Sequence, residues 1–150
     1  MIALMPSSVT TPVTEYEDTV RKETRAQWSP FVPILSNWQT QALRALFQIA
    51  TLPHNWDSYG SPPLSPTSLA TSIDLLSEID LDDLPIPHVA PVPGGGVQFE
   101  WSVGQRELEF EILRDGSVEF LKVDSKQPVE EGQLRYVDQM FSLLSWLTSG

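Results

Sequence analysis

The stretch VQFEWSVGQRELEFEILRDGSVEFLKV, residues 97–123, decides the fold because apolar and polar residues alternate along most of its length. Alternation with a period of two is typical of β-strands that have one buried face. Turn residues divide the stretch at Gly104-Gln105 and at Arg114–Gly116, so it predicts three antiparallel strands. These strands are Val97–Val103, Arg106–Leu113 and Ser117–Val123.

The two turns also set the register in which the predicted strands pair. A two-residue turn with glycine first matches type II′ geometry, and it pairs Trp101 with Leu108. The second turn requires three residues, because a two-residue turn would set Ile112 against Glu119 and bring a charge into the core. One face then carries only apolar residues, and we expect helices to cover it. That face comprises Val97, Phe99, Trp101, Leu108, Phe110, Ile112, Val118 and Phe120.

The opposite face of the predicted sheet is crowded with glutamates. In this register Glu100 faces Glu109 and Glu111 faces Glu119, and like charges directly opposite each other destabilise a sheet. Three interpretations are open: a solvated face that Lys122 and Arg106 partly neutralise, a surface that meets a basic partner, or a divalent-metal site. For the metal site, no histidine or aspartate joins the carboxylates. The face comprises Gln98, Glu100, Glu107, Glu109, Glu111 and Glu119.

Two helices are predicted before the strands and one after them. Ser36 is the expected N-cap of the first helix, with Gln39 as its capping-box partner. Ser65 is the expected cap of the second, and Pro66 stands at its first helical position. The second helix ends in acidic residues, which its dipole disfavours there, so this end is either a solvated tail or a surface for a partner. The predicted helices are Asn37–Leu52, Pro66–Ile79 and Val129–Leu147.

These elements predict an α+β fold of two layers. Residues 84–96 are rich in proline and have room only for a short edge strand at His88–Pro91, since proline does not suit a central strand. The expected order is α-α-β-β-β-α, with the helices on one face of a three-stranded antiparallel meander within residues 34–150. Residues 1–33 are expected to form a flexible arm that could order on a partner. Its candidate anchors are Met5, Tyr16, Val20 and Trp28.

The composition argues against several functional classes. The 150 residues include 20 acidic and 9 basic side chains, a net charge of −11, which argues against direct binding to nucleic acid. There is no cysteine, so thiolate chemistry and disulfides are excluded. No apolar run is long enough to span a membrane, and residues 1–14 lack the basic lead of a secretory signal. We therefore expect a cytoplasmic protein.

The loop HNWDSYG, residues 54–60, is the most unusual local segment. In one interpretation Trp56 and Tyr59 close the junction between the helices and the sheet, while Asp57 and Asn55 accept hydrogen bonds from loop amides. In the other interpretation the loop is a recognition hot spot, because tryptophan and tyrosine dominate the energetics of many interfaces. Both interpretations stay open at this point.

Two of these motifs resemble a group of small, uncharacterised bacterial proteins. The likeness rests on Asn55-Trp56-Asp57-x-Tyr59-Gly60 and on Gly95-Gly96-Val97-Gln98-x-Glu100-Trp101, and it covers roughly residues 50–123. It implies a bacterial or mobile-element origin and carries no assigned activity. It also implies a structural or functional link among Trp56, Asp57, Tyr59, Gln98, Glu100 and Trp101.

Together these features favour a non-enzymatic protein without a cofactor. We expect an acidic module that docks on a basic protein partner, as an antitoxin, an immunity protein or an accessory subunit does; modules of this size are often co-encoded with their targets. One alternative is a metal-dependent hydrolase or nuclease that uses the glutamates. Another is a self-associating structural subunit, with the sheet edge at Ser117–Val123 extended by another chain. The candidate partner-binding residues are Glu100, Glu109, Glu111, Glu119, Trp56, Asp57 and Tyr59.

Overall fold

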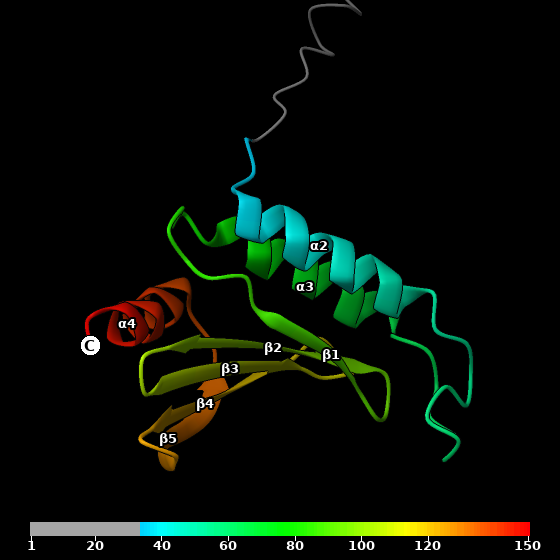
Figure 1. Ribbon diagram of the computed structural model, residues 1–150. Helices are drawn as coiled ribbons and strands as arrows, with labels where there is room; N and C mark the ends of the chain where they lie inside the picture. The colour runs from blue at the N-terminus through cyan, green and yellow to red at the C-terminus, as the bar shows by residue number, and fades with distance from the viewer. Residues whose placement is uncertain (1–33) are drawn as a thin grey trace, which may run out of the picture. The chain divides into compact units, whose positions relative to one another are not determined.

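A five-stranded antiparallel sheet, with strand order β1-β2-β3-β4-β5, forms one layer of the fold, and helices form the other (Figure 1). The computed structural model describes residues 34–150, so the predictions for the arm and its four anchors lie outside the described residues. Within residues 34–150, no helix has the length and apolar character needed to cross a membrane. The elements are α2 (Asn37–Ala50), α3 (Pro66–Glu78), β1 (His88–Val92), β2 (Gly96–Val103), β3 (Arg106–Ile112), β4 (Val118–Asp124), β5 (Gln127–Leu134) and α4 (Val137–Thr148).

The three central strands pair in the predicted register. Phe110 lies opposite Phe99 in β2 and opposite Phe120 in β4. Gly104 begins the β2–β3 turn with a φ of +60°, and Gly116 has a φ of +86° in the turn between β3 and β4. Glycine adopts such values without steric cost. The turn assignments and the register that they imply are confirmed.

The inner face of the sheet, which is the face that the helices cover, forms the core. All eight apolar residues predicted for this face are at most 8% exposed. Trp101 lies at the centre of this layer, with its ring centroid 5.9 Å from that of Trp38 on α2 and 5.8 Å from that of Phe110. Burial of this apolar surface is the main force that holds the two layers together.

The first two helices begin as predicted. Ser36 Oγ accepts a hydrogen bond from the Gln39 amide, and Gln39 Oε1 accepts one from the Ser36 amide at 2.9 Å, which completes the capping box. Ser65 caps α3, with Pro66 at its first helical position. Gln39 is buried and also donates to the Ile79 carbonyl at 3.0 Å. The same side chain therefore caps α2 and ties it to the end of α3.

The helix predicted over Val129–Leu147 is wrong in its first part. Residues 127–134 form β5, which pairs with β4, and α4 begins only at Val137. The reason lies in the preceding turn, where Ser125 and Lys126 have φ values of +51° and +66°. Two successive residues at positive φ are the geometry of a type I′ hairpin turn, which returns the chain along β4.

Two residues of β5 also favour a strand over a helix. Gly132 lowers helix stability by about 1 kcal/mol relative to alanine. It lies opposite Phe120, whose ring is 3.1 Å from the position that a Cβ at residue 132 would occupy. Pro128 stands near the start of the strand, at the edge of the sheet, where a missing N–H is tolerated.

The fifth strand changes which edges the sheet presents. Because β5 pairs along the whole of β4, the prediction that Ser117–Val123 offers an edge to another chain is wrong. The edge strands are β5 and β1, and β1 matches the short edge strand expected at His88–Pro91. Pro91 in β1 and Pro128 in β5 remove donors from these edges, which discourages pairing with a further strand.

Candidate functional site

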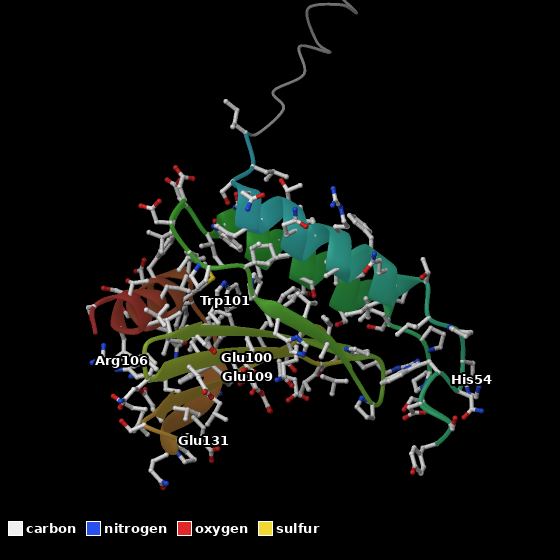
Figure 2. The ribbon with its side chains drawn as sticks, in the orientation of Figure 1. His54, Glu100, Trp101, Arg106, Glu109 and Glu131 are labelled. Atoms are coloured by element: carbon white, nitrogen blue, oxygen red, sulfur yellow. The ribbon has the colours of Figure 1, made fainter. Side chains whose placement is uncertain are left out.

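The outer face of the sheet, on the side away from α2, α3 and α4, carries the predicted glutamates. Side chains alternate between faces along a strand, so residues next to the buried ones point outward. Figure 2 shows Trp101 between the sheet and the helices, whereas Glu100, Glu109 and Glu131 lie on the other side of the sheet. None of the three helices α2, α3 and α4 covers this outer face (Figure 1).

The glutamates form rows that run across the strands. As predicted, Glu100 lies opposite Glu109, and Glu111 lies opposite Glu119. Side chains in such pairs start from Cβ atoms about 4.5–5.5 Å apart, so the carboxylates repel one another. The first row is His88, Glu100, Glu109, Leu121 and Glu131, and the second is Ala90, Gln98, Glu111, Glu119 and Gln133.

Glu109 occupies the centre of this face. Partial burial raises the pKa of Glu109, and the negative charges of Glu100, Glu111 and Glu107 raise it further. Each of these causes disfavours the charged form of the carboxyl group. Burial and the neighbouring glutamates therefore both act against the charged form of Glu109.

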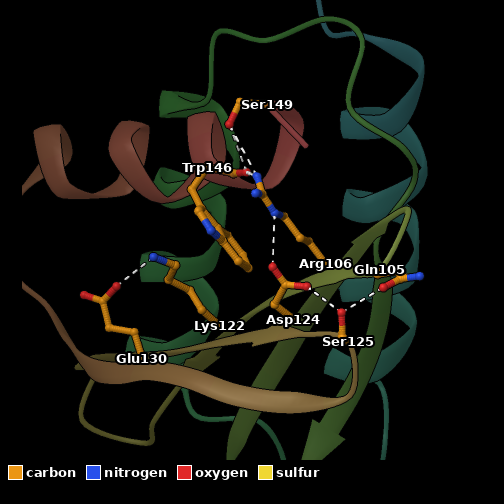
Figure 3. A network of polar contacts seen from close by, with 8 residues as sticks. All are labelled: Gln105, Arg106, Lys122, Asp124, Ser125, Glu130, Trp146 and Ser149. Carbon is orange, nitrogen blue, oxygen red and sulfur yellow. Dashed lines mark hydrogen bonds and ion pairs between the residues drawn. The ribbon is translucent and has the colours of Figure 1, made fainter.

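The two basic residues expected to neutralise the outer face lie on the inner face instead, against α4 (Figure 3). Lys122 Nζ lies 2.7 Å from Glu130 Oε2 and 4.5 Å from the ring centroid of Trp146. The Arg106 guanidinium lies 5.0 Å from the same centroid, donates to the Trp146 carbonyl and forms an ion pair with Asp124 at 3.5 Å. The predicted neutralisation is wrong, because both residues share the strand face of the apolar core.

This arrangement leaves the outer glutamates without ion pairs. The two ion pairs found within residues 34–150 are Arg106–Asp124 and Lys122–Glu130, and neither involves the outer face. Because side chains alternate between the two faces of a strand, the basic side chains of β3 and β4 point inward. Most of the acidic side chains of these strands point outward.

A hollow of about 510 Å³ opens in the outer face over β3, β4 and β5. Half-buried Leu121 lies at its base between Glu109 and Glu131 in the row across the strands. Sequence reasoning missed Glu131 because the β5 segment was assigned to a helix, and it missed Leu121 although that residue lies in a predicted strand. The signal for Leu121 was present, since it lies one residue from the inward-facing Phe120. The hollow is lined by Glu109, Glu111, Glu119, Phe120, Leu121, Glu131, Gly132 and Gln133.

The loop between α2 and α3 is held by its own polar groups, as one interpretation predicts. The Asp57 carboxylate accepts hydrogen bonds from the amides of Tyr59 at 2.9 Å and Ser61 at 3.1 Å. Asn55 Oδ1 accepts one from the Gly60 amide at 2.8 Å. The hydrogen bond from the Ser61 hydroxyl is the main cause that lowers the pKa of Asp57. These bonds define the shape of the loop.

The two aromatic residues of this loop have different environments. Trp56 is half-buried, and its Nε1 donates to the Pro62 carbonyl at 3.3 Å. Tyr59 is 92% exposed, so the prediction that it closes the junction between helices and sheet is wrong. Asn55 and Ser58 each have a φ of +64°, an uncommon conformation outside glycine. The loop therefore presents Tyr59 to solvent on a backbone that its own hydrogen bonds hold in place.

The predicted site residues occupy two places in the structure. The four glutamates share the outer face of β2, β3 and β4, whereas Trp56, Asp57 and Tyr59 lie on the loop after α2. Of the residues linked by the sequence resemblance, Trp101 belongs to the core. Within residues 34–150, no group of three or more histidine, aspartate or glutamate side chains is arranged to hold a metal ion. Comparison of the chain with protein-family models, with curated proteins and with solved structures yields no match.

Proposed function

We propose that this protein is a non-enzymatic binding module whose outer sheet face docks on a basic protein partner. The observation that carries the proposal is the sorting of charge between the two faces of the sheet. Glu100 and Glu109 lie opposite each other across β2 and β3, whereas Arg106 and Lys122 form their ion pairs on the inner face. His88 of β1 lies opposite Glu100 on the other side and forms no ion pair within residues 34–150. A partner that supplies lysine or arginine side chains would relieve the repulsion between the two glutamates on binding.

The hollow in the outer face favours a long basic side chain as the central contact. Lysine and arginine combine an apolar stem with a charged head. The stem would lie on Leu121, and the head would reach the carboxylates of Glu109, Glu119 and Glu131 that surround it. A net charge of −11 would also steer such a partner toward the protein, most strongly at low salt.

Tyr59 offers a second contact surface on the separate loop after α2. An exposed tyrosine contributes much contact area at little entropic cost, and a preorganised loop reduces that cost further. The hydrogen bonds from Asp57 and Asn55 supply this preorganisation. We therefore propose Trp56, Asp57 and Tyr59 as a second, separate binding surface that supplies an aromatic contact.

The class of protein that these features fit is an acidic antitoxin, an immunity protein or an accessory subunit of bacterial origin. Such proteins act by covering a basic surface of a partner, so they need no catalytic constellation. Charge complementarity would give this partner a high association rate and a strong dependence on ionic strength. Both properties can be measured on a partner captured from the native host.

Capture from a lysate of the native host tests the proposal. The immobilised full chain is compared with a Glu100→Gln/Glu109→Gln variant and with a control, Asp82→Asn/Asp83→Asn, which changes the net charge equally at positions away from the outer face. We expect the wild-type protein and the control to retain a basic protein at low salt and release it at high salt. The glutamate variant should retain much less. Equal capture by all three proteins, or capture of no basic protein at either salt concentration, would contradict the proposal.

A further inference from the structure

The central strand of the sheet, β3, presents a line of carboxylates on the outer face. Glu107, Glu109 and Glu111, which we call the β3 carboxylates, stand at every second residue of the strand and are half-buried. Their neighbours in register on β2 and β4 are uncharged or acidic. We propose that the segment of the partner that docks here is an α-helix that lies along β3 and carries basic residues four positions apart. This inference rests on the proposed function, because it specifies which kind of partner segment the outer face binds.

The spacing of the β3 carboxylates matches the spacing of side chains on one face of a helix. Two residues of a strand span about 6.4–6.8 Å, and their side chains point to the same face of the sheet. Four residues of an α-helix rise about 6 Å, and residues four apart are neighbours on the helix surface. A helix that lies along β3 therefore brings one basic residue to each of the three carboxylates.

An extended partner segment has side chains at a similar spacing, but its backbone groups find no partner on this face. The strands β2, β3 and β4 each have a neighbour on both sides, so their backbone groups pair within the sheet. A further strand can pair only at β1 or β5, where Pro91 and Pro128 remove donors. A helix pairs its own backbone groups, and a helix packed on a sheet is a common layer arrangement. The uncovered outer face therefore favours a helix (Figure 1).

The hollow in the outer face gives such a helix an apolar contact beside the carboxylates. It opens over β3, β4 and β5, and half-buried Leu121 lies in it opposite Glu109. On a helix, a residue three positions from a basic residue lies next to it on the surface. A leucine at that position would displace water from Leu121, which is favourable. The expected segment therefore carries a basic strip over β3 and an apolar residue over β4.

The basic residues of the protein itself do not neutralise the centre of this face. Neither ion pair within residues 34–150 involves an outer glutamate. Lys126 lines a recess together with Glu107, so Glu109 and Glu111 are the more open of the β3 carboxylates. Apart from Arg44 on α2 and the inward-facing pair, the basic residues of the described chain stand at the margins of the sheet. They are His88 on the edge strand β1, Arg114 and Lys126 in turns, and Arg135 after the end of β5.

A second copy of this chain does not supply the helix that the outer face selects. Of the three described helices, α2 carries a single basic residue, Arg44, and α3 and α4 carry none. Each copy also has a net charge of −11, so two copies repel each other. The occupant that fits the charges of the outer face is a basic helix of a different protein.

Titration with three peptides, followed by NMR on the full chain with labelled methyl groups, tests the inference. The first is a helical alanine-based peptide with three lysines four residues apart and a leucine three residues after the first lysine. The second has the same composition, but its lysines are five residues apart and so lie around the whole helix. The third alternates lysine with threonine and carries the same charge. We expect the first to shift the Leu121 methyl signals saturably, and to bind about 2- to 30-fold more tightly than the second, the range for two exposed ion pairs. The third should also bind more weakly than the first.

The outcomes separate this inference from the proposed function. Equal affinity for the first two peptides, or tighter binding of the alternating peptide, would overturn the inference and leave the proposed function in place. No saturable shift with any of the three peptides would contradict both. If the Leu121 signals shift with protein concentration alone, the occupant is a second copy and the inference is wrong.

Variants of the β3 carboxylates show whether the spacing of charge is what the protein reads. Glu109→Gln/Glu111→Gln should weaken binding of the first peptide roughly 2- to 30-fold, and it should reduce the preference for the first peptide over the second. Asp82→Asn/Asp83→Asn changes the net charge equally and should retain both the affinity and the preference. A preference that persists in the glutamate variant would overturn the inference.

Discussion

On the inner face of the sheet, Arg106 and Lys122 each have an acidic partner and lie against the ring of Trp146. On the outer face of the same strands, Glu100 and Glu109 lie opposite each other and neither joins an ion pair within residues 34–150. On the inner face each basic residue is paired with an acidic one, as expected for charges that stabilise the fold. The outer arrangement opposes stability, and this contrast is why we propose that the outer face has a binding function.

The largest difference between the faces should appear at two neighbouring residues of β2. Trp101→Ala removes a fully buried side chain and should lower the free energy of unfolding by about 3–5 kcal/mol. Glu100→Gln, one residue away, should not lower it at all. Urea denaturation of both variants measures the contrast. Similar losses at the two positions would mean that the outer face is also structural.

The cation cluster on the inner face should contribute a smaller but clear amount. Arg106→Gln removes the hydrogen bond to the Trp146 carbonyl and the contact with its ring. We expect the free energy of unfolding to fall by about 1–2 kcal/mol, since the site is partly exposed. Arg44→Gln, on α2 and outside both ion pairs, is the control and should change little. Equal effects in the two variants would show that the contacts of Arg106 on the inner face do not stabilise the fold.

Removing charge from the outer face should have the opposite sign. Glu100→Gln/Glu109→Gln relieves one directly opposed pair and should raise the free energy of unfolding by about 0.2–1 kcal/mol at low salt. The gain should shrink at high salt, because exposed charges are then screened. Denaturation at two salt concentrations, with Asp82→Asn/Asp83→Asn as control, checks this. A loss of stability would show that the glutamates are already compensated.

The smallest effect concerns the titration of Glu109. Because its pKa is raised in the folded protein, the folded state binds the proton more tightly than the unfolded chain does. The charged carboxylate therefore lowers stability above its folded pKa, and this penalty disappears as the pH falls through that value. The gain from Glu109→Gln alone should be present at neutral pH and shrink on acidification, beginning at a pH above the ordinary titration range of a glutamate. A gain that grows on acidification would contradict this expectation.

Much of the central sheet is predictable from local patterns. The alternation over residues 97–123 and the glycines at 104 and 116 specify strands, turns and register together, because a shift by one residue would bury glutamates. The capping residues Ser36 and Ser65 likewise locate the start of α2 and α3. Even the inward direction of Arg106 follows from alternation, since it lies two residues from Leu108.

Other features depend on contacts that are distant in sequence. Strand β5 carries Glu130 and Glu131 in succession, a pattern that also suits the first turn of a helix. Its conformation is decided by the Ser125-Lys126 turn and by pairing with β4. The exposure of Tyr59 depends in the same way on the hydrogen bonds of Asp57 and Asn55, which residue type alone does not specify.

Capture of the basic partner with the Glu100→Gln/Glu109→Gln variant, after denaturation has shown that this variant is folded, tests the central claim most directly. We predict a protein that is at least as stable as the wild type and retains much less partner than Asp82→Asn/Asp83→Asn does. A stabilised variant that captures the partner as well as the wild type would contradict the claim, because the crowded glutamates would then have no role in binding.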